Sequence, residues 1–147
     1  MWLNPQDVCH RELKQSDDGK EGEIKVYTYI TTVFAKPGSA DDVGRFYQGL
    51  APILKEADGF RDRKIFRAQT GMMADAVRKI YTPEELAAHP EPPHEDPGVQ
   101  FIIIETWDSV EKRMLFSKNV AGSRSKDLIP HLLPGHSHEF YEDITEP

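Results

Sequence analysis

The chain has 147 residues, a length that suits one domain, and its 25 acidic side chains outnumber 18 basic ones to give a formal net charge of −7. Such a chain is a poor candidate for a nucleic-acid binder, which needs clustered Lys and Arg to bind phosphates. The single cysteine excludes an internal disulfide and a cysteine-rich zinc site. No apolar run is long enough for a membrane span, and the N-terminus lacks a secretory leader pattern, so we expect a cytoplasmic protein.

The negative charge lies in two segments. Residues 1–23 carry six acidic and three basic side chains, and residues 71–98 carry six acidic and two basic ones, so the other 96 residues are neutral. We therefore expect one domain whose core comprises residues 24–70 and 99–147, with an N-terminal arm and an acidic, proline-rich insertion. A short helix is predicted in each addition, beginning near Asn4 in the arm and at Thr82 in the insertion. The proline-rich residues 89–98 are predicted to be extended and irregular.

The first half of the core has the pattern strand, helix, strand. Residues 24–34 are rich in β-branched and aromatic side chains, which is typical of a strand. Apolar side chains recur at helical spacing over residues 40–57, with Ser39 as the predicted N-cap and Pro52 as a predicted kink. Residues 60–68 form the second predicted strand.

The second half repeats this order after the insertion. Residues 99–107 are the most apolar stretch and are predicted to form a central strand. A helix capped by Asp108 or Ser109 follows, and residues 138–144 form the last predicted strand. The predicted inner face of that helix holds Val110, Met114 and Ser117.

Two β-α-β halves predict a ferredoxin-like α+β sandwich, in which a four-stranded antiparallel sheet has helices on one face. The first and third strands are apolar on both of their faces. An apolar sheet face without helices is an association surface, and a second copy related by a twofold axis is the simplest cover. We therefore expect a homodimer.

Four segments resemble a known family: the strand ending in Lys36–Gly38, the helix with Phe46 and Leu50, the turn Asp58–Phe60 and the stretch Glu105–Glu111. They look like the antibiotic biosynthesis monooxygenases of the dimeric α+β barrel superfamily, over residues 24–70 and 99–146. The resemblance implies a pocket between sheet and helices and an oxidation of aromatic, quinol- or anthrone-type molecules without a cofactor. Haem-degrading members carry a histidine where this chain has Phe116, so haem is not expected.

Oxidation without a cofactor requires a deprotonated substrate that passes an electron to oxygen, beside a base or hydrogen-bond acceptor in an apolar cavity. The predicted catalytic residues are Tyr29, His131 and Trp107. The predicted substrate-binding residues are Phe46, Tyr47, Phe66, Phe116 and His136.

Each of these residues also has a structural interpretation. Trp107 can anchor the following helix, the tyrosines can pack at a dimer interface, and the histidines can lie on the surface. The spacing of His131, His136 and His138 matches no metal signature, so no metal site is predicted.

The second predicted strand carries a row of arginines, Arg61, Arg63 and Arg67. They can bind an anionic group of a substrate, or they can protect an edge strand from pairing. Two other functions stay open beside the monooxygenase: a non-catalytic ligand-binding or structural homodimer, and an isomerase or cyclase on the same fold.

Overall fold

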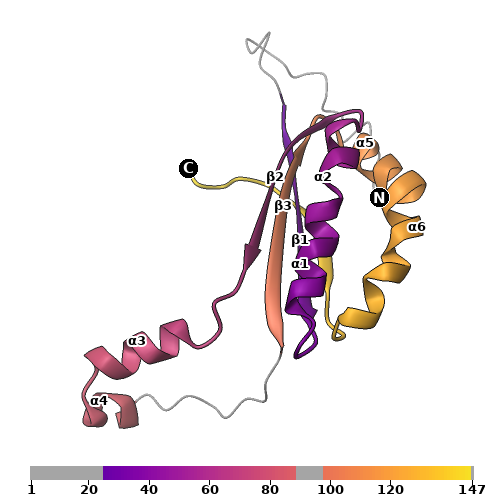
Figure 1. Cartoon of the computed structure of the whole chain (residues 1–147). Helices are drawn as coiled ribbons and strands as arrows, with labels where there is room; N and C mark the ends of the chain where they lie inside the picture. Colours follow the sequence, from indigo (N-terminus) through magenta and orange to yellow (C-terminus); the bar gives the residue numbers. More distant parts are fainter. Residues whose placement is uncertain (1–24, 89–97, 147) are drawn as a thin grey trace.

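The computed structural model describes residues 25–88 and 98–146, and Figure 1 shows their arrangement. The strands are β1 (Tyr27–Ala35), β2 (Phe60–Arg67), β3 (Val99–Trp107) and β4 (Ser137–Tyr141). The helices and helical turns are α1 (Ala40–Gly49), α2 (Ala51–Lys55), α3 (Met72–Ile80), α4 (Pro83–Ala88), α5 (Val110–Phe116), η2 (Ser117–Ala121), α6 (Gly122–Arg124), η3 (Ser125–Asp127) and η4 (Ile129–His131).

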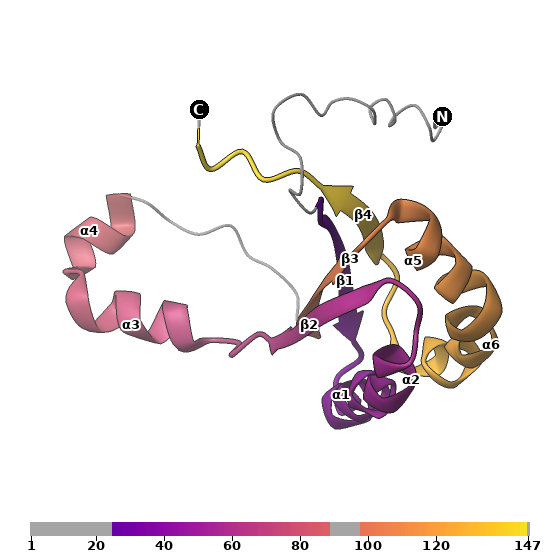
Figure 2. The same ribbon diagram turned by 90° about the horizontal axis from the view of Figure 1, so that it is seen from above.

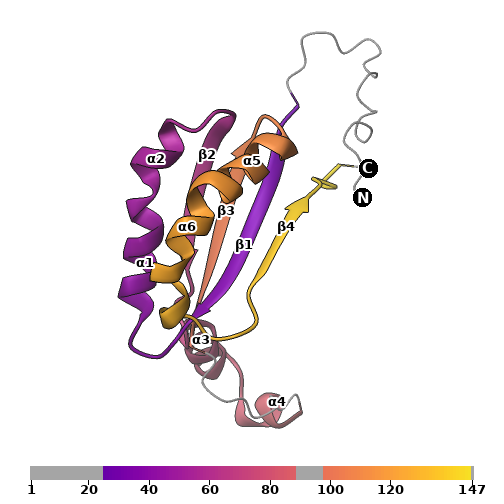
Figure 3. The ribbon, with the colours of Figure 1, turned by 90° about the vertical axis from the view of Figure 1, so that its right-hand side faces the viewer.

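The four strands form one antiparallel sheet in the order β2-β3-β1-β4 (Figure 3). Helices α1, α2, α5 and α6 cover one face of this sheet (Figures 1 and 2). The predicted ferredoxin-like α+β architecture is therefore confirmed. Strand β2, which carries the row of arginines, is an edge strand. This agrees with the interpretation that the arginines protect an edge from pairing.

Alternation along the two central strands positions the core. The residues that face the helices are Tyr29, Thr31, Val33 and Ala35 from β1 and Phe101, Ile103, Glu105 and Trp107 from β3, and all of them are buried. They pack against apolar side chains of the helices, among them Val43, Leu54 and Phe116. Burial of this apolar surface is the main favourable contribution to folding.

The first helical segment divides near Pro52, as predicted. Helix α1 ends at Gly49, and α2 begins at Ala51 with the proline in its first turn. Ser39 occupies the predicted N-cap position, but its side chain makes no capping hydrogen bond. The hydroxyl group of Ser39 instead lies 3.4 Å from Nδ1 of His131.

The helix after β3 is capped by Ser109, whose hydroxyl accepts a hydrogen bond from the backbone N–H of Lys112. Its predicted inner face is wrong, because Val110 and Met114 are exposed. The buried side chains are Arg113 and Phe116. The helix is rotated away from the orientation that its apolar pattern predicts, because Arg113 forms an ion pair with the carboxylate of Glu105 in the sheet.

The described part of the insertion contains two helices. Helix α4 begins with a complete capping box, in which Thr82 and Glu85 each accept a hydrogen bond from the other's backbone N–H. Helix α3 was not predicted. The predicted N-terminal helix and most of the irregular residues 89–98 lie outside the described residues. In the parts of the chain that are described, no helix has the length and hydropathy needed to cross a membrane.

Candidate functional site

Glu105 is the centre of a buried polar cluster between the sheet and the helices. It lies in the central strand β3 on the face toward the helices. One of its carboxylate oxygens accepts hydrogen bonds from Trp107 Nε1 at 2.8 Å and from Arg113 Nε at 2.6 Å. The side chains of Arg113 and Glu105 are only 8% and 7% exposed. A buried charge is tolerated only when it is paired in this way.

Arg113 projects from α5 into a set of aromatic rings. Its guanidinium carbon lies 4.1 Å from the ring centre of Tyr29, 5.4 Å from that of Phe116 and 5.7 Å from that of Trp107. It also donates a hydrogen bond to the hydroxyl of Ser117. Ring faces attract a cation, and the ion pair and rings together hold this guanidinium in one position.

A second guanidinium, that of Arg63, reaches the cluster from β2. A register shift between Phe60 and Asp62 adds one residue to this strand, so Arg63 pairs with Glu105. In a regular strand Asp62 would stand there, so the bulge replaces a carboxylate with a guanidinium beside Glu105. Burial lowers the pKa of Arg63, although the nearby Glu105 carboxylate opposes this shift.

The cluster holds an excess of positive charge. Within the described residues, Nη1 of Arg63 is buried and has no hydrogen-bond partner. The single carboxylate of Glu105 already binds Arg113, so two guanidinium groups share one negative charge. A buried donor without a partner is costly, and an anionic oxygen is the partner that best offsets this cost.

Two tyrosine hydroxyls border the cluster. Burial raises the pKa of Tyr47 well above its ordinary value, and Glu105 raises it further. Burial also raises the pKa of Tyr29, although the Arg113 cation lowers it in part. Both phenols therefore stay protonated and can donate hydrogen bonds.

His138 lies at the edge of the cluster on β4. Its Nδ1 is 3.2 Å from the Thr31 hydroxyl, and its ring stacks on Tyr29 with centroids 6.2 Å apart. Partial burial lowers the pKa of His138, and the electrostatic interactions with the neighbouring His136 and Arg113 lower it further. The imidazole is therefore neutral near pH 7 and can accept a proton.

The structure brings together most of the residues predicted from the sequence. Tyr29, Trp107 and Phe116 surround Arg113, and Tyr47 lies beside them. The substrate-binding candidates Phe46 and His136 lie just outside this set. The ring centroids of Phe46 and Tyr47 are 5.3 Å apart, and those of His136 and His138 are 5.2 Å apart. The roles of these residues stay predictions.

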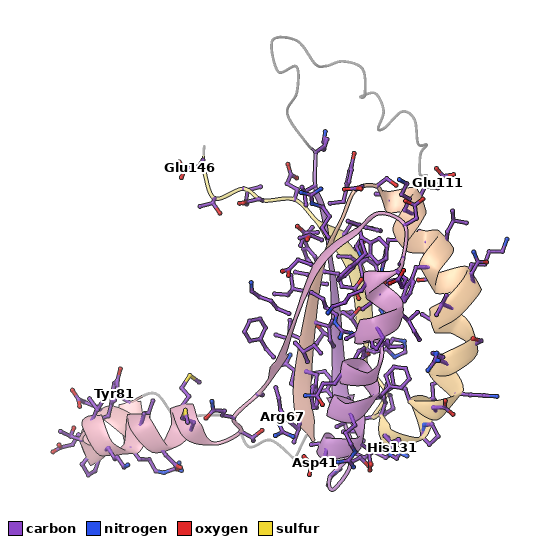
Figure 4. All side chains as sticks on the ribbon, turned by 45° about the horizontal axis from the view of Figure 1, so that its top comes forward. Asp41, Arg67, Tyr81, Glu111, His131 and Glu146 are labelled. Atoms are coloured by element: carbon purple, nitrogen blue, oxygen red, sulfur yellow. The ribbon has the colours of Figure 1, made fainter. Side chains whose placement is uncertain are left out.

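Two predicted residues lie apart from the cluster. His131 lies near Ser39 and Asp42, at the end of the sheet where Figure 4 also shows Asp41 and Arg67. Phe66 pairs with Ile102 on the other face of the sheet and is 52% exposed. Across the described ranges, no group of three or more His, Cys, Asp or Glu side chains is placed to hold a metal ion.

Sequence reasoning did not select Glu105 and Arg113 as site residues. Glu105 is the one charged residue in the apolar strand of residues 99–107, and it has the inward parity of Phe101 and Ile103. A charged side chain at a buried position requires a partner, so the inward position of Glu105 was the sequence signal that could have indicated a buried ion pair. The identity of the partner depends on the packing of α5 and is not visible in a local pattern.

Solved structures share the fold of this chain at low sequence identity. A protein of Nitrosomonas europaea, provisionally named an antibiotic biosynthesis monooxygenase, matches 83% of this chain and 93% of its own with a TM-score of 0.58 and 8% identity. A provisionally so named protein of Caulobacter crescentus matches 81% of this chain and 90% of its own, with a TM-score of 0.56 and 12% identity. The chain has the fold of the antibiotic biosynthesis monooxygenases. The same fold occurs in SnoaB of Streptomyces nogalater, named a cofactor-independent oxygenase, which matches 81% of this chain and 93% of its own with a TM-score of 0.52 and 8% identity.

No protein-family model matches the sequence, and no curated protein matches it either. The likeness to the monooxygenase structures is therefore a likeness of fold.

Proposed function

We propose that this protein is a cofactor-independent monooxygenase that oxidises an aromatic, quinol-type small molecule between the sheet and the helices. The observation that carries the proposal is the buried excess of positive charge, in which Arg63 and Arg113 share the one carboxylate of Glu105. The rings of Tyr29 and Trp107 around Arg113 give the cluster an aromatic surround, which favours an aromatic substrate. The fold of the antibiotic biosynthesis monooxygenases supports the same reaction class.

Arg63 and His138 have complementary roles in this proposal. A phenol or enol of the substrate loses its proton to the neutral imidazole of His138. The resulting oxyanion binds the free Nη1 donor of Arg63 and the phenolic hydroxyl of Tyr47. An oxyanion placed there is more stable than in an apolar cavity of neutral groups, so the reactive form of the substrate accumulates.

The oxidation balances without an external reductant. The substrate anion gives one electron to dioxygen, and the resulting radical and superoxide combine to form a peroxide at a ring carbon. Loss of water from the protonated peroxide converts a methylene or C–H position into a carbonyl. One oxygen atom of dioxygen enters the product, and the other leaves as water. The surrounding side chains exclude bulk water from the intermediates.

Oxygen uptake tests this function directly. We expect uptake with members of a panel of anthrones and quinols, and a loss of roughly tenfold or more in kcat/KM in Arg63→Gln, because a charge-assisted hydrogen bond to the oxyanion disappears. Arg67→Gln is the matched control, since Arg67 lies on the same strand and pairs with the exposed Asp41. Uptake no faster than in buffer across the panel, or equal losses in the two variants, would contradict the proposal.

We also propose that the protein is a homodimer formed through the sheet face that the helices leave uncovered. This open face is made of Thr28, Ile30, Thr32, Phe34, Asp62, Lys64, Phe66, Gln100, Ile102, Ile104, Thr106, Ser137, Glu139 and Tyr141. Its centre is apolar, and such surfaces mark association sites. We expect sedimentation to give twice the chain mass of 16.8 kDa at micromolar concentration. A mass of one chain would show that the open face is not an interface.

A further inference from the structure

Helices α3 and α4 form an arm, residues 72–88, that extends away from the sheet. The arm follows β2 and projects on the side of the sheet opposite α1, α2, α5 and α6 (Figures 1 and 2). Within the described residues, no side chain of this arm is buried. Figure 4 shows Tyr81 far from the body of the fold.

Helix α3 is amphipathic although the described chain does not cover it. Met73 and Ile80, seven residues apart and so on one side of the helix, are each 76% exposed. The other side carries Asp75, Arg78 and Lys79, and the first two form an ion pair at 2.7 Å. A helix of nine residues is too short to be stable in water by itself. An apolar stripe on such a helix is therefore expected to dock on another surface.

The position of the arm indicates which surface that is. The arm and the open face lie on the same side of the sheet, so a body that packs on the open face lies beside the arm. On the edge strand β2 the open face carries Lys64 and, 3.9 Å from it, Asp62; on the other edge strand, β4, it carries Glu139, in the same cross-strand row as Lys64. A twofold axis parallel to the strands places β2 of one copy over β4 of the next, so Lys64 meets the opposite charge of Glu139 and Asp62 meets the uncharged Tyr141.

The same axis places the apolar centre of the open face, which includes Ile30, Ile102 and Ile104, against itself. A second copy of this chain therefore matches the open face in both charge and apolar character. We propose that the arm is a clasp, which packs the apolar side of α3 against the second copy. This inference rests on the homodimer proposed above and adds a second contact surface to it.

Sedimentation of two arm variants tests the clasp. In the full chain, Met73→Glu with Ile80→Glu places two charges on the apolar side, and we expect the dissociation constant of the dimer to rise about 100-fold. Lys79→Glu changes the net charge by the same amount on the polar side, so we expect a change of less than about threefold. Circular dichroism of the aromatic core, unchanged in both variants, shows that each subunit is folded.

The outcomes separate the clasp from the dimer. A wild-type chain that sediments as a monomer overturns the homodimer and the clasp together. A wild-type dimer whose dissociation constant is unchanged in the double variant, or rises equally in Lys79→Glu, overturns the clasp and leaves the homodimer intact. Hydrogen exchange gives a second readout: amides of residues 72–80 should be protected in the dimer and lose protection on dilution to the monomer. Protection that is independent of dilution would also overturn the clasp.

Discussion

Glu105 determines the character of the buried cluster at the scale of single residues. A buried carboxylate in the middle of an apolar strand requires a cationic partner, and the guanidinium of Arg113 on the next helix is that partner. The inward position of Glu105 could be predicted from the alternation of residues 99–107. The pairing could not, because Arg113 looks like a surface residue in a hydrophobic pattern. Tyr29, Tyr47 and Trp107 could be selected from the sequence because aromatic residues in predicted strands and helices are recognisable without their partners, and their roles stay predictions.

Loss of one member of the ion pair is expected to be costly. Arg113→Met removes the guanidinium that forms the ion pair with Glu105 and leaves Arg63 as the neighbouring cation, so the free energy of unfolding should fall by about 3 kcal/mol in urea titrations. Adding Glu105→Gln should recover only part of this loss, because Gln still accepts from Trp107 Nε1 but Arg63 then loses the carboxylate beside it. Arg45→Met, at an exposed pair with Asp42, should cost less than about 1 kcal/mol. Similar losses at both arginines would show that Arg113 is not held by a buried charge.

His138 is expected to make stability depend on pH. Its pKa is lower in the folded chain than the ordinary value of 6.5, so the unfolded chain binds more protons as the pH falls below that value. The free energy of unfolding should therefore decrease on acidification below about pH 6.5. Urea midpoints measured from neutral to mildly acidic pH should show a shallower decrease in His138→Gln than in the wild type. Identical pH profiles in this range would mean that the imidazole titrates normally.

At the scale of elements, the order of strands and helices could be predicted, whereas the details that depend on packing could not. Pro52 fixed the break between α1 and α2 because proline lacks the N–H that a continuous helix needs. Helix α3 was not predicted because nothing at its start resembles a side-chain cap: its N-cap residue is Gly71, which has no side chain. The inner face of α5 was wrong because an ion pair, rather than apolar periodicity, fixes the rotation of that helix.

Gly98 is expected to be required at the start of β3. Its φ is +80°, and a Cβ placed there would lie 2.0 Å from the carbonyl oxygen of Ala35. Gly98→Ala should therefore lower the free energy of unfolding by about 2–4 kcal/mol, since backbone strain and a clash act together. Gly38→Ala is the control, because its φ is +86° in open space, and it should cost about 1 kcal/mol. Equal losses in chemical denaturation would mean that the strand shifts to accept the methyl group.

At the scale of the whole molecule, the fold follows from two β-α-β halves, but the cluster follows from how the strands are aligned. The bulge between Phe60 and Asp62 places Arg63, rather than Asp62, beside Glu105. A one-residue shift of this kind cannot be recognised from the alternation of side-chain types in residues 60–68. The row of arginines therefore suggested an anion site without indicating which arginine forms it. The arm of residues 72–88, which leaves the sheet, lies within the acidic insertion that the charge distribution predicted (Figure 1).

The most direct test of the proposed reaction follows the oxygen atoms. A substrate from the anthrone and quinol panel is converted under dioxygen labelled with heavy oxygen, and the product is analysed by mass spectrometry. We expect one labelled oxygen atom in each product molecule, no label from labelled water, and no turnover when oxygen is removed. Turnover that continues without oxygen, or a product oxygen that comes from water, would contradict a monooxygenase and would favour an isomerase or cyclase on the same fold.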